Sequence, residues 1–412
     1  MNNNVPKLRF KGFEDEWKEY KLGDLFNLSS GGTPSRSNNE FWDGDIPWVT
    51  TGEIDFNVIK ETKEKITSEA INNSSAKIFP VGTILIAMYG QGKTRGKSAI
   101  LGIEATTNQA CAALMSKEKI NKTFAYQYIS GNYENIRSMC NVGGQKNLSL
   151  GILNNFNISV SSLQEQEKIA NFLSKVDSII EKQEKKVEYW NSYKKGIMQK
   201  IFSQRIRFKD ENEENYPAWE EKKLGSLGQT YTGLSGKTKE DFGFGDGKYI
   251  TYLNVFKNTK VDINMFDLVD IKEDEKQNKV LKGDILFTTS SETPNEVGMA
   301  SVCDNDIENL YLNSFCFGFR LNANKDIDYI FIGYLLRSPS LRRKISILAQ
   351  GSTRYNLSKS ELMKMKIQIP HLEEQRKIVD FISNIDSIIE KETQKLEELR
   401  QLKKGLLQQM LV

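Results

Sequence analysis

Hydrophobic residues recur at helical spacing along two long stretches of the chain. The first runs from Leu163 to Phe202 without a proline, and the second runs from Leu372 to Met410. In both stretches, apolar residues fill a, d and e positions over about five heptads, which predicts an amphipathic helix about 60 Å long. Polar residues break the stripe at Gln183 and, in the second stretch, at the matching Glu392.

The two stretches are copies of each other. Residues 148–203 align with residues 357–412 at a constant offset of 209 without a gap, and about 23 of the 56 positions are identical. The strongest matches are an Asp-Ser-Ile-Ile-Glu-Lys run, which begins at Asp177 and at Asp386, and a Lys-Lys-Gly run. Because neither helix can bury its apolar stripe alone, we expect the copies to pack against each other as an antiparallel coiled coil.

The regions before the two helices also resemble each other, though more weakly. Both open on a Trp-x-x-x-Lys-Leu-Gly motif, at Trp17 and at Trp219, and both hold short apolar runs punctuated by Gly, Asn and Ser clusters. Such runs predict strands, and periodic stretches among them predict short helices. The clearest examples are residues 83–87 and 284–288 for strands, and residues 124–137 and 331–347 for helices.

The chain therefore alternates variable and constant units. We predict an α+β fold with two similar α+β domains, joined by two long helices that pack as an antiparallel coiled coil with an internal pseudo-twofold repeat. The predicted boundaries are 1–160 and 204–370 for the domains, and 161–203 and 371–412 for the helices. A constant frame that carries different loops is typical of a protein that recognises two different targets.

Motifs for catalysis, nucleotide binding or metal binding are missing or incomplete in the sequence. A P-loop-like string begins at Gln91, but a glycine is required at that position. His371 is the single histidine, and the four cysteines form no Cys-x-x-Cys pair, which argues against zinc sites, disulfides and histidine-based catalysis. Neither a Pro-Pro nor a Pro-Asp pair occurs, so the usual signatures of amino-methylating DNA enzymes and of PD…ExK nucleases are lacking. We therefore expect no catalytic residue and no metal site.

The net charge limits how this chain could bind a nucleic acid. The chain has 57 Lys and Arg residues against 54 Asp and Glu residues, which gives +3. A general nucleic-acid binder is much more basic, so contacts with phosphate must come from local clusters or from a partner. No apolar run approaches the 18 residues of a membrane span, and the first residues lack a signal-peptide core, so we expect a cytoplasmic protein.

Basic and polar residues gather on the predicted loops of both domains. Arg, Lys, Gln, Ser and Thr side chains are those that bind base edges and phosphates. For any single residue, a solvated surface side chain is the alternative, but the loops as a set favour DNA contact because the two domains share a frame and differ in their loops. The candidate DNA-binding residues are Ser35, Arg36, Tyr89, Gln91, Lys93, Arg95, Lys237, Lys239, Thr289, Ser290 and Arg354.

Taken together, these features resemble the specificity subunit of type I restriction–modification systems. The resemblance covers nearly the whole chain and depends most on the duplicated (Q/E)-E-Q-x-K-I-x-x-F-(L/I)-S-x-(V/I)-D-S-I-I-E-K helices, then on the Trp-x-x-x-Lys-Leu-Gly openings. Gly-Gly-Thr-Pro-Ser from Gly31 and Gly-Ser-Thr-Arg from Gly351 are further family-like segments.

The resemblance implies two target-recognition domains, each reading one half of a bipartite site in double-stranded DNA. It also implies a subunit without catalytic activity or a cofactor of its own. Two modification subunits would bind it, and restriction and translocase subunits would complete the complex. S-adenosylmethionine, ATP and magnesium would then be held by these partner subunits.

The long helices also suggest a surface for partners. Trp190 and Tyr193 widen the first apolar stripe, and aromatic residues are frequent anchors at protein interfaces. We expect them to bind a modification subunit, with closure of the coiled-coil end as the alternative. For the whole chain, the alternative function is a non-enzymatic coiled-coil adaptor with two protein-binding β-rich domains. A stand-alone methyltransferase or nuclease is disfavoured by the missing motifs.

Overall fold

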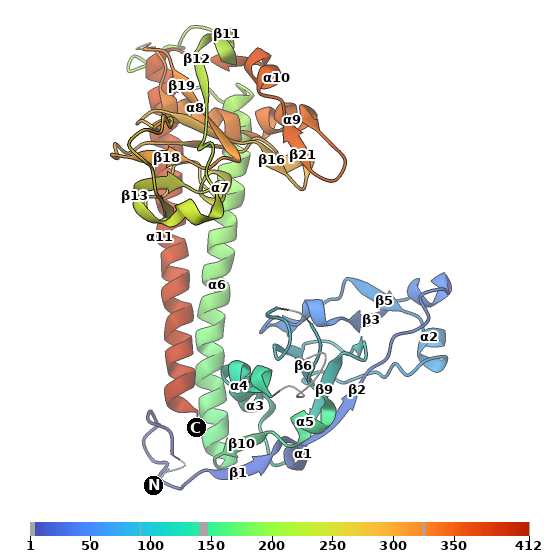
Figure 1. Cartoon of the computed structure of the whole chain (residues 1–412). Helices are drawn as coiled ribbons and strands as arrows, with labels where there is room; N and C mark the ends of the chain where they lie inside the picture. The colour runs from blue at the N-terminus through green and yellow to red at the C-terminus, as the bar shows by residue number, and fades with distance from the viewer. Residues whose placement is uncertain (1–4, 91, 140–146, 324–325, 412) are drawn as a thin grey trace. The chain divides into compact units, whose positions relative to one another are not determined.

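The chain folds into two compact units that each combine one α+β domain with segments of both long helices. Unit 1 comprises Met1–Lys185 with Gln394–Val412, and unit 2 comprises Lys186–Thr393. The long helices are α6 (Leu163–Phe202) and α11 (Leu372–Met410), and both coincide with the stretches in which apolar residues recur at helical spacing (Figure 1). The computed structural model describes residues 5–90, 92–139, 147–323 and 326–411.

The domain of unit 1 is built on a five-stranded sheet in the order β2-β9-β6-β7-β4, with a smaller sheet β5-β3-β8. Strand β6 lies in the middle of the larger sheet and all four of its residues are buried, which explains its continuous apolar sequence. The strands are β1 (Lys18–Lys21), β2 (Phe26–Ser30), β3 (Ile46–Val49), β4 (Val58–Ile59), β5 (Glu64–Ile66), β6 (Ile84–Ala87), β7 (Ser98–Leu101), β8 (Thr106–Thr107), β9 (Cys111–Ser116) and β10 (Asn157–Val160). The helices are α1 (Leu22–Leu25), η1 (Asn39–Trp42), η2 (Thr51–Glu53), α2 (Ser68–Asn72), α3 (Lys122–Gly131), α4 (Tyr133–Ser138) and α5 (Leu150–Asn154).

The domain of unit 2 repeats this order of strands, except that its larger sheet ends at β17, the counterpart of β7. Its larger sheet is β12-β19-β15-β17 and its smaller sheet is β14-β13-β18, while a third sheet, β16-β21-β20, is added. The strands are β11 (Glu220–Lys223), β12 (Gly228–Thr232), β13 (Phe242–Ile250), β14 (Phe266–Val269), β15 (Ile285–Thr288), β16 (Ser290–Ser291), β17 (Ala300–Val302), β18 (Leu310–Leu312), β19 (Cys316–Leu321), β20 (Ala349–Gln350), β21 (Tyr355–Leu357) and β22 (Lys366–Ile369). The helices are η3 (Leu224–Ser226), η4 (Lys239–Asp241), α7 (Tyr252–Lys257), η5 (Pro294–Glu296), α8 (Tyr329–Arg337), α9 (Pro339–Ile347) and α10 (Lys359–Lys364).

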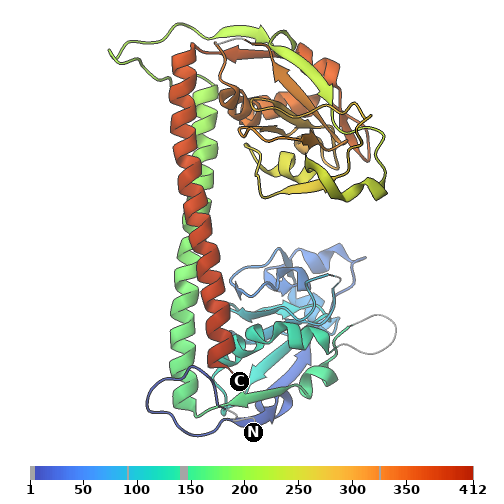
Figure 2. The same ribbon diagram turned by 60° about the vertical axis from the view of Figure 1, so that its left-hand side comes forward.

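Within each unit, the segments of α6 and α11 lie side by side and run antiparallel (Figures 1 and 2). Ion pairs between the helices show the direction, because the partner's residue number falls as the number along α6 rises. The pairs are Asp177–Lys403 at 2.6 Å and Glu184–Arg400 at 2.7 Å in unit 1, and Lys186–Glu392 at 2.6 Å and Lys194–Asp386 at 2.5 Å in unit 2. The expected fold class and the antiparallel packing are confirmed.

The duplicated aspartate and lysine of the two helices explain part of the sequence repeat. In each unit, the aspartate of one helix pairs with the lysine of the other. Asp177 also accepts a hydrogen bond from Gln127 in α3 at 2.5 Å, and Asp386 accepts one from Tyr334 in α8 at 2.7 Å. The repeated residues therefore join three helices at the same place in both units.

The duplicated Glu-Gln pair holds the segment that leads into each domain. Glu165 is buried and pairs with Arg9 at 2.7 Å, and the buried Glu374 pairs with Arg207 at 2.7 Å and accepts a hydrogen bond from Trp219 at 3.1 Å. The glutamine that follows each glutamate accepts a backbone N–H from the residue that caps α3 or α8. Each long helix is thus fixed at its start to the domain it follows.

Side chains from both long helices also complete the core of each domain. Ile169 and Met410 belong to the core of unit 1, and their repeat counterparts Ile378 and Ile201 belong to the core of unit 2. Among the residues that the structure describes, no helix has the length and apolar character needed to cross a membrane.

Candidate nucleic-acid interface

The first candidate loop of unit 1 follows β2 through two closely packed glycines. The backbone of Gly31 lies so near Thr107 that a Cβ atom would stand 2.0 Å from the Thr107 carbonyl oxygen. Glycine is therefore required here for the turn that presents Ser35 and Arg36, which are both exposed. Ser35 Oγ lies 2.8 Å from Ser37 Oγ, which leaves the loop polar at its tip.

The guanidinium group of Arg36 is already bound within the protein. It makes two hydrogen bonds to Glu64, at 2.5 and 3.0 Å, and lies 3.5 Å from the centre of the Trp42 ring. Hydrogen bonding from Arg36 lowers the pKa of the Glu64 carboxyl group, so the pair stays charged at neutral pH. A DNA contact by Arg36 would have to share or break this pair.

The second candidate loop of unit 1 is the turn between β6 and β7. These strands are antiparallel neighbours, whereas a P-loop joins a strand to a helix, so the P-loop-like string is a hairpin turn. Tyr133 donates a hydrogen bond to the Lys93 carbonyl oxygen at 2.6 Å, which ties the turn to α4. Tyr89 and Lys93 are exposed and Arg95 is half-buried, while Gln91 lies outside the described residues.

The first candidate loop of unit 2 contains two lysines, Lys237 and Lys239, that differ in exposure. The side chain of Lys237 is only 4% exposed, and its ammonium group lies 2.6 Å from Glu275. Lys239, at the start of η4, is exposed. Lys237 therefore holds the loop against the protein, and Lys239 is the lysine whose charge faces solvent.

The second candidate region of unit 2 brings three predicted residues together. Arg354 donates a hydrogen bond through Nε to Ser290 Oγ at 3.2 Å, and its guanidinium lies 5.4 Å from the centre of the Phe315 ring. Thr289 donates from Oγ1 to the Phe315 carbonyl oxygen at 2.8 Å. Phe315, which is 53% exposed, did not stand out in the sequence because it lies in an apolar stretch that reads as core.

Two half-buried arginines support this region through hydrogen bonds to its backbone. Arg342 donates hydrogen bonds to the carbonyl oxygens of Val297 and Gly298, and Arg337 donates to that of Ala300, so both bind the backbone that follows β16. Burial lowers the pKa of each of these arginines to about 10, which still leaves them charged at neutral pH. The backbone that follows β16 is therefore held by charged side chains from α8 and α9.

Aromatic residues of α6 form a small cluster within unit 2. The rings of Trp190 and Tyr193 lie 5.6 Å apart, and Tyr189 lies 5.6 Å from Trp190. Tyr189 and Tyr193 are 61% and 39% exposed, so the cluster presents aromatic surface to solvent instead of filling a core. Tyr189 was not among the expected anchors, although its place next to Trp190 would have suggested it.

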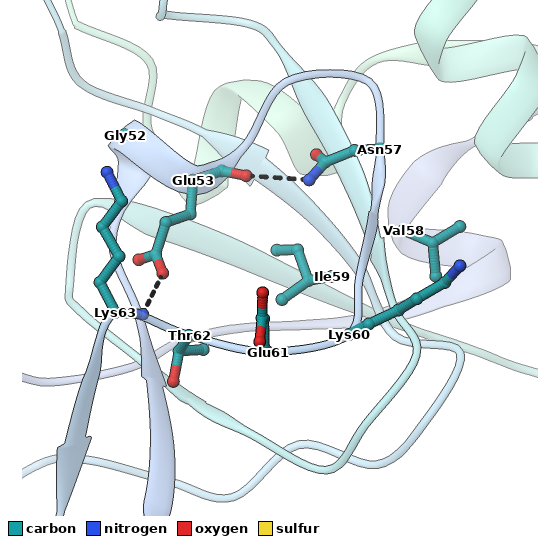
Figure 3. A pocket seen from close by; sticks show the side chains of 9 residues that line it. All are labelled: Gly52, Glu53, Asn57, Val58, Ile59, Lys60, Glu61, Thr62 and Lys63. Carbon is teal, nitrogen blue, oxygen red and sulfur yellow. Dashed lines mark hydrogen bonds between the residues drawn. The ribbon is translucent and has the colours of Figure 1, made fainter. Parts of the chain in front are cut away.

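A surface hollow of about 580 Å³ is lined by residues of the Gly52–Lys63 segment (Figure 3). The Glu53 carboxylate at its edge accepts hydrogen bonds from the backbone N–H groups of Thr50, at 2.8 Å, and Lys63, at 2.9 Å. These bonds close the loop and occupy both carboxylate oxygens. Glu53 therefore serves the structure of the loop, and the hollow is not a candidate binding site. Within the described ranges, no group of His, Cys, Asp and Glu residues is suited to hold a metal ion.

Comparison with known proteins identifies the class to which this architecture belongs. Residues 14–189 and 217–401 match the type I restriction modification DNA specificity domain, once in each half of the chain. Because the two matches span most of the sequence, the chain belongs to this family. It is the specificity subunit of a type I restriction–modification system and contains two DNA-recognition domains.

Individual relatives and a solved structure match this chain over different lengths. The specificity subunit of the type I restriction enzyme MjaVIII from Methanocaldococcus jannaschii is 24% identical, and the alignment covers 96% of this chain and 92% of the relative. The EcoR124I/EcoR124II specificity subunit from Escherichia coli is 31% identical over 44% of this chain and 48% of its own. A crystal structure of a type I restriction–modification S subunit from M. genitalium shares the fold, with a TM-score of 0.55, 16% identity and 99% of both chains covered.

Proposed function

We propose that each DNA-recognition domain reads one half of a bipartite site in double-stranded DNA, and that the paired helices set the distance between the halves. The observation that carries this proposal is one frame used twice with different loop tips. The side-chain oxygens of Asn108 and Asn313 each accept a hydrogen bond from the backbone N–H of the second residue after them. That residue is Ala110 in one domain and Phe315 in the other. Identical frames with different tips suit the reading of two different sequences.

The candidate loop residues divide into two groups by their surroundings. Ser35, Tyr89, Lys93, Lys239 and Arg354 are exposed and available to DNA. The second group is bonded within the protein, although Arg36 is also exposed: Arg36 to Glu64, Lys237 to Glu275, and Thr289 and Ser290 to neighbouring segments. We propose that the exposed residues contact bases or phosphates and that the second group positions the loops. Arg95, half-buried in the β6–β7 turn, belongs with the proposed DNA-contacting residues.

We further propose that the chain is non-catalytic and acts in the cytoplasm with partner subunits that carry the chemistry. Two modification subunits would supply S-adenosylmethionine, and restriction subunits would supply the ATP- and magnesium-dependent reactions. The aromatic cluster of Trp190 and Tyr193, with Tyr189, is proposed as an anchor for a modification subunit because exposed aromatic clusters are frequent interface anchors. The near-neutral charge of the chain fits an arrangement in which partners share the binding of DNA.

Mapping methylated positions across a genome that carries the complete system tests the two-reader proposal. We expect methylation within a site made of two short specific segments separated by a gap of fixed length and any sequence. One continuous recognition sequence would contradict it. Absence of DNA binding by the assembled complex would favour the adaptor alternative instead.

A further inference from the structure

Arg354 differs from the other candidate cations in what its side chain leaves unbound. Only Nε is engaged, by Ser290 Oγ, and the two terminal nitrogens find no hydrogen-bond partner among the residues that the structure describes. Arg36, in contrast, uses its terminal nitrogens on Glu64. The guanidinium of Arg354 is therefore oriented by its Nε bond, and its two terminal nitrogens are available to donate to a ligand.

The backbone of Phe315 is held by three hydrogen bonds. Its N–H donates to Asn313 Oδ1 at 2.8 Å, and its carbonyl oxygen accepts from Thr289 N at 3.0 Å and from Thr289 Oγ1 at 2.8 Å. An exposed aromatic ring on a fixed backbone loses little freedom on binding a ligand. The guanidinium of Arg354 near this ring gains further orientation from the cation–π contact.

Ser290 connects this pair to the sheet of unit 2. It belongs to β16, which pairs with β21 directly after Arg354, and its carbonyl oxygen accepts a hydrogen bond from Tyr252 at 2.6 Å. The turn before Arg354 contains Gly351 with φ +132°, where a Cβ atom would lie 2.2 Å from the Arg354 carbonyl oxygen. The backbone on both sides of the Arg354–Ser290 bond is thus fixed.

We propose that Arg354 and Phe315 form a guanine-reading site of the second DNA-recognition domain, with Ser290 as the residue that positions the guanidinium. The terminal nitrogens of Arg354 donate to O6 and N7 of one guanine in the major groove, the pairing that suits a planar fork. Phe315 packs its ring against the neighbouring base. This inference rests on the proposed function of the domain and adds the chemical identity of one base pair that the domain reads.

The complete methyltransferase complex, assembled with its modification subunits, allows a direct test. Methylation rates are measured on a DNA library with every single base-pair change in both half-sites, for the wild type and for Arg354→Ala, Arg354→Lys and Phe315→Ala. Arg343→Ala serves as the control, because Arg343 is an exposed arginine of the same domain whose side chain, among the residues that the structure describes, bonds only the Pro339 carbonyl oxygen.

We expect Arg354→Ala to reduce discrimination roughly 5- to 150-fold at one G·C pair of one half-site, with the other half-site unchanged. Arg354→Lys keeps the charge but lacks the fork, so it should lose discrimination at the same pair. Phe315→Ala should weaken preference at that pair or the one beside it, and the Arg343 control should leave base preference unaltered.

Two results would overturn the inference. One is a uniform loss of binding on all sequences, which marks a phosphate contact, and the other is full retention of discrimination by both Arg354 variants. Exchange of residues 204–360 for those of a relative separates this failure from failure of the proposed function. If the exchange changes one half-site while the Arg354 variants change none, the domain is a reader and the guanine site alone is wrong.

Discussion

The two DNA-recognition domains are most alike where they meet the long helices and least alike at their loop tips. The Asp–Lys and Glu–Arg pairs recur in both units with nearly the same distances. At the tips, Ala110 is 9% exposed where Phe315 is 53% exposed, although the same asparagine bond holds both. The comparison teaches that the frame fixes where a side chain is presented, and the tip decides what it can recognise.

The largest expected effect tests the frame. Glu165→Gln and Glu374→Gln each remove a buried carboxylate from a half-buried arginine, which should cost on the order of 3 kcal/mol in stability. Because each pair lies within one unit, each variant should lower the protection of backbone amides from hydrogen exchange in that unit alone. Hydrogen exchange resolved by segment measures this, and equal loss of protection in both units by either variant would show that the units are not independent.

The second effect concerns the aromatic cluster of α6. Trp190→Ala and Tyr193→Ala should weaken binding of a modification subunit by about 2 kcal/mol each, the size expected for an interface anchor. The repeat-matched variants Leu399→Ala and Leu402→Ala are the comparison, since aliphatic residues contribute less as anchors. Titration of the folded chain with the modification subunit measures the affinities. Unchanged affinity in both aromatic variants would remove the cluster from the interface.

A third, smaller effect tests the pairing between the helices. Reversing the charge of Asp177 or of Lys403 alone should destabilise unit 1 by about 1 kcal/mol, and exchanging both residues should restore most of that loss. The same exchange of Asp386 with Lys194 should act on unit 2. Thermal unfolding of the single and double variants measures the coupling. Simple additivity, without restoration, would mean that the pairs contribute nothing to the packing.

The smallest effect distinguishes exposed from buried lysines in the loops. Lys93→Ala and Lys239→Ala should each flatten the dependence of log K on log salt by about 0.9 if each contacts one phosphate. Lys237→Ala should leave that slope unchanged because its ammonium group is already paired with Glu275. Binding titrations at several salt concentrations give the slopes. A reduced slope for Lys237→Ala would place this lysine on the DNA after all.

The long helices could be predicted from the sequence because they are repeated in it. Periodicity and the 209-residue offset predicted α6 and α11 to within about two residues at each end, and the apolar runs predicted β6 and β15. The pairing of Asp177 with Lys403 was not predicted, because the repeat shows which residues recur but not which of them meet across the two helices. Strand order was beyond reach because it depends on contacts between distant segments.

The candidate site was harder to predict, for a physical reason. Lys237 and Lys239 are alike in sequence, and only the fold shows that Glu275, 38 residues on, buries the first. Phe315 looked like a core residue because its neighbours are buried strand residues. Exposure and partnering of loop side chains depend on tertiary contacts, which local patterns do not encode.

The central claim is that each DNA-recognition domain reads its own half-site. Replacing residues 204–360 with the same domain of a relative, in the otherwise unchanged chain, tests it most directly when the methylated sites of the assembled complex are mapped. The account predicts a site in which one half changes to that of the relative while the other half is unaltered. A correctly assembled hybrid that changes both halves, or neither, would contradict it.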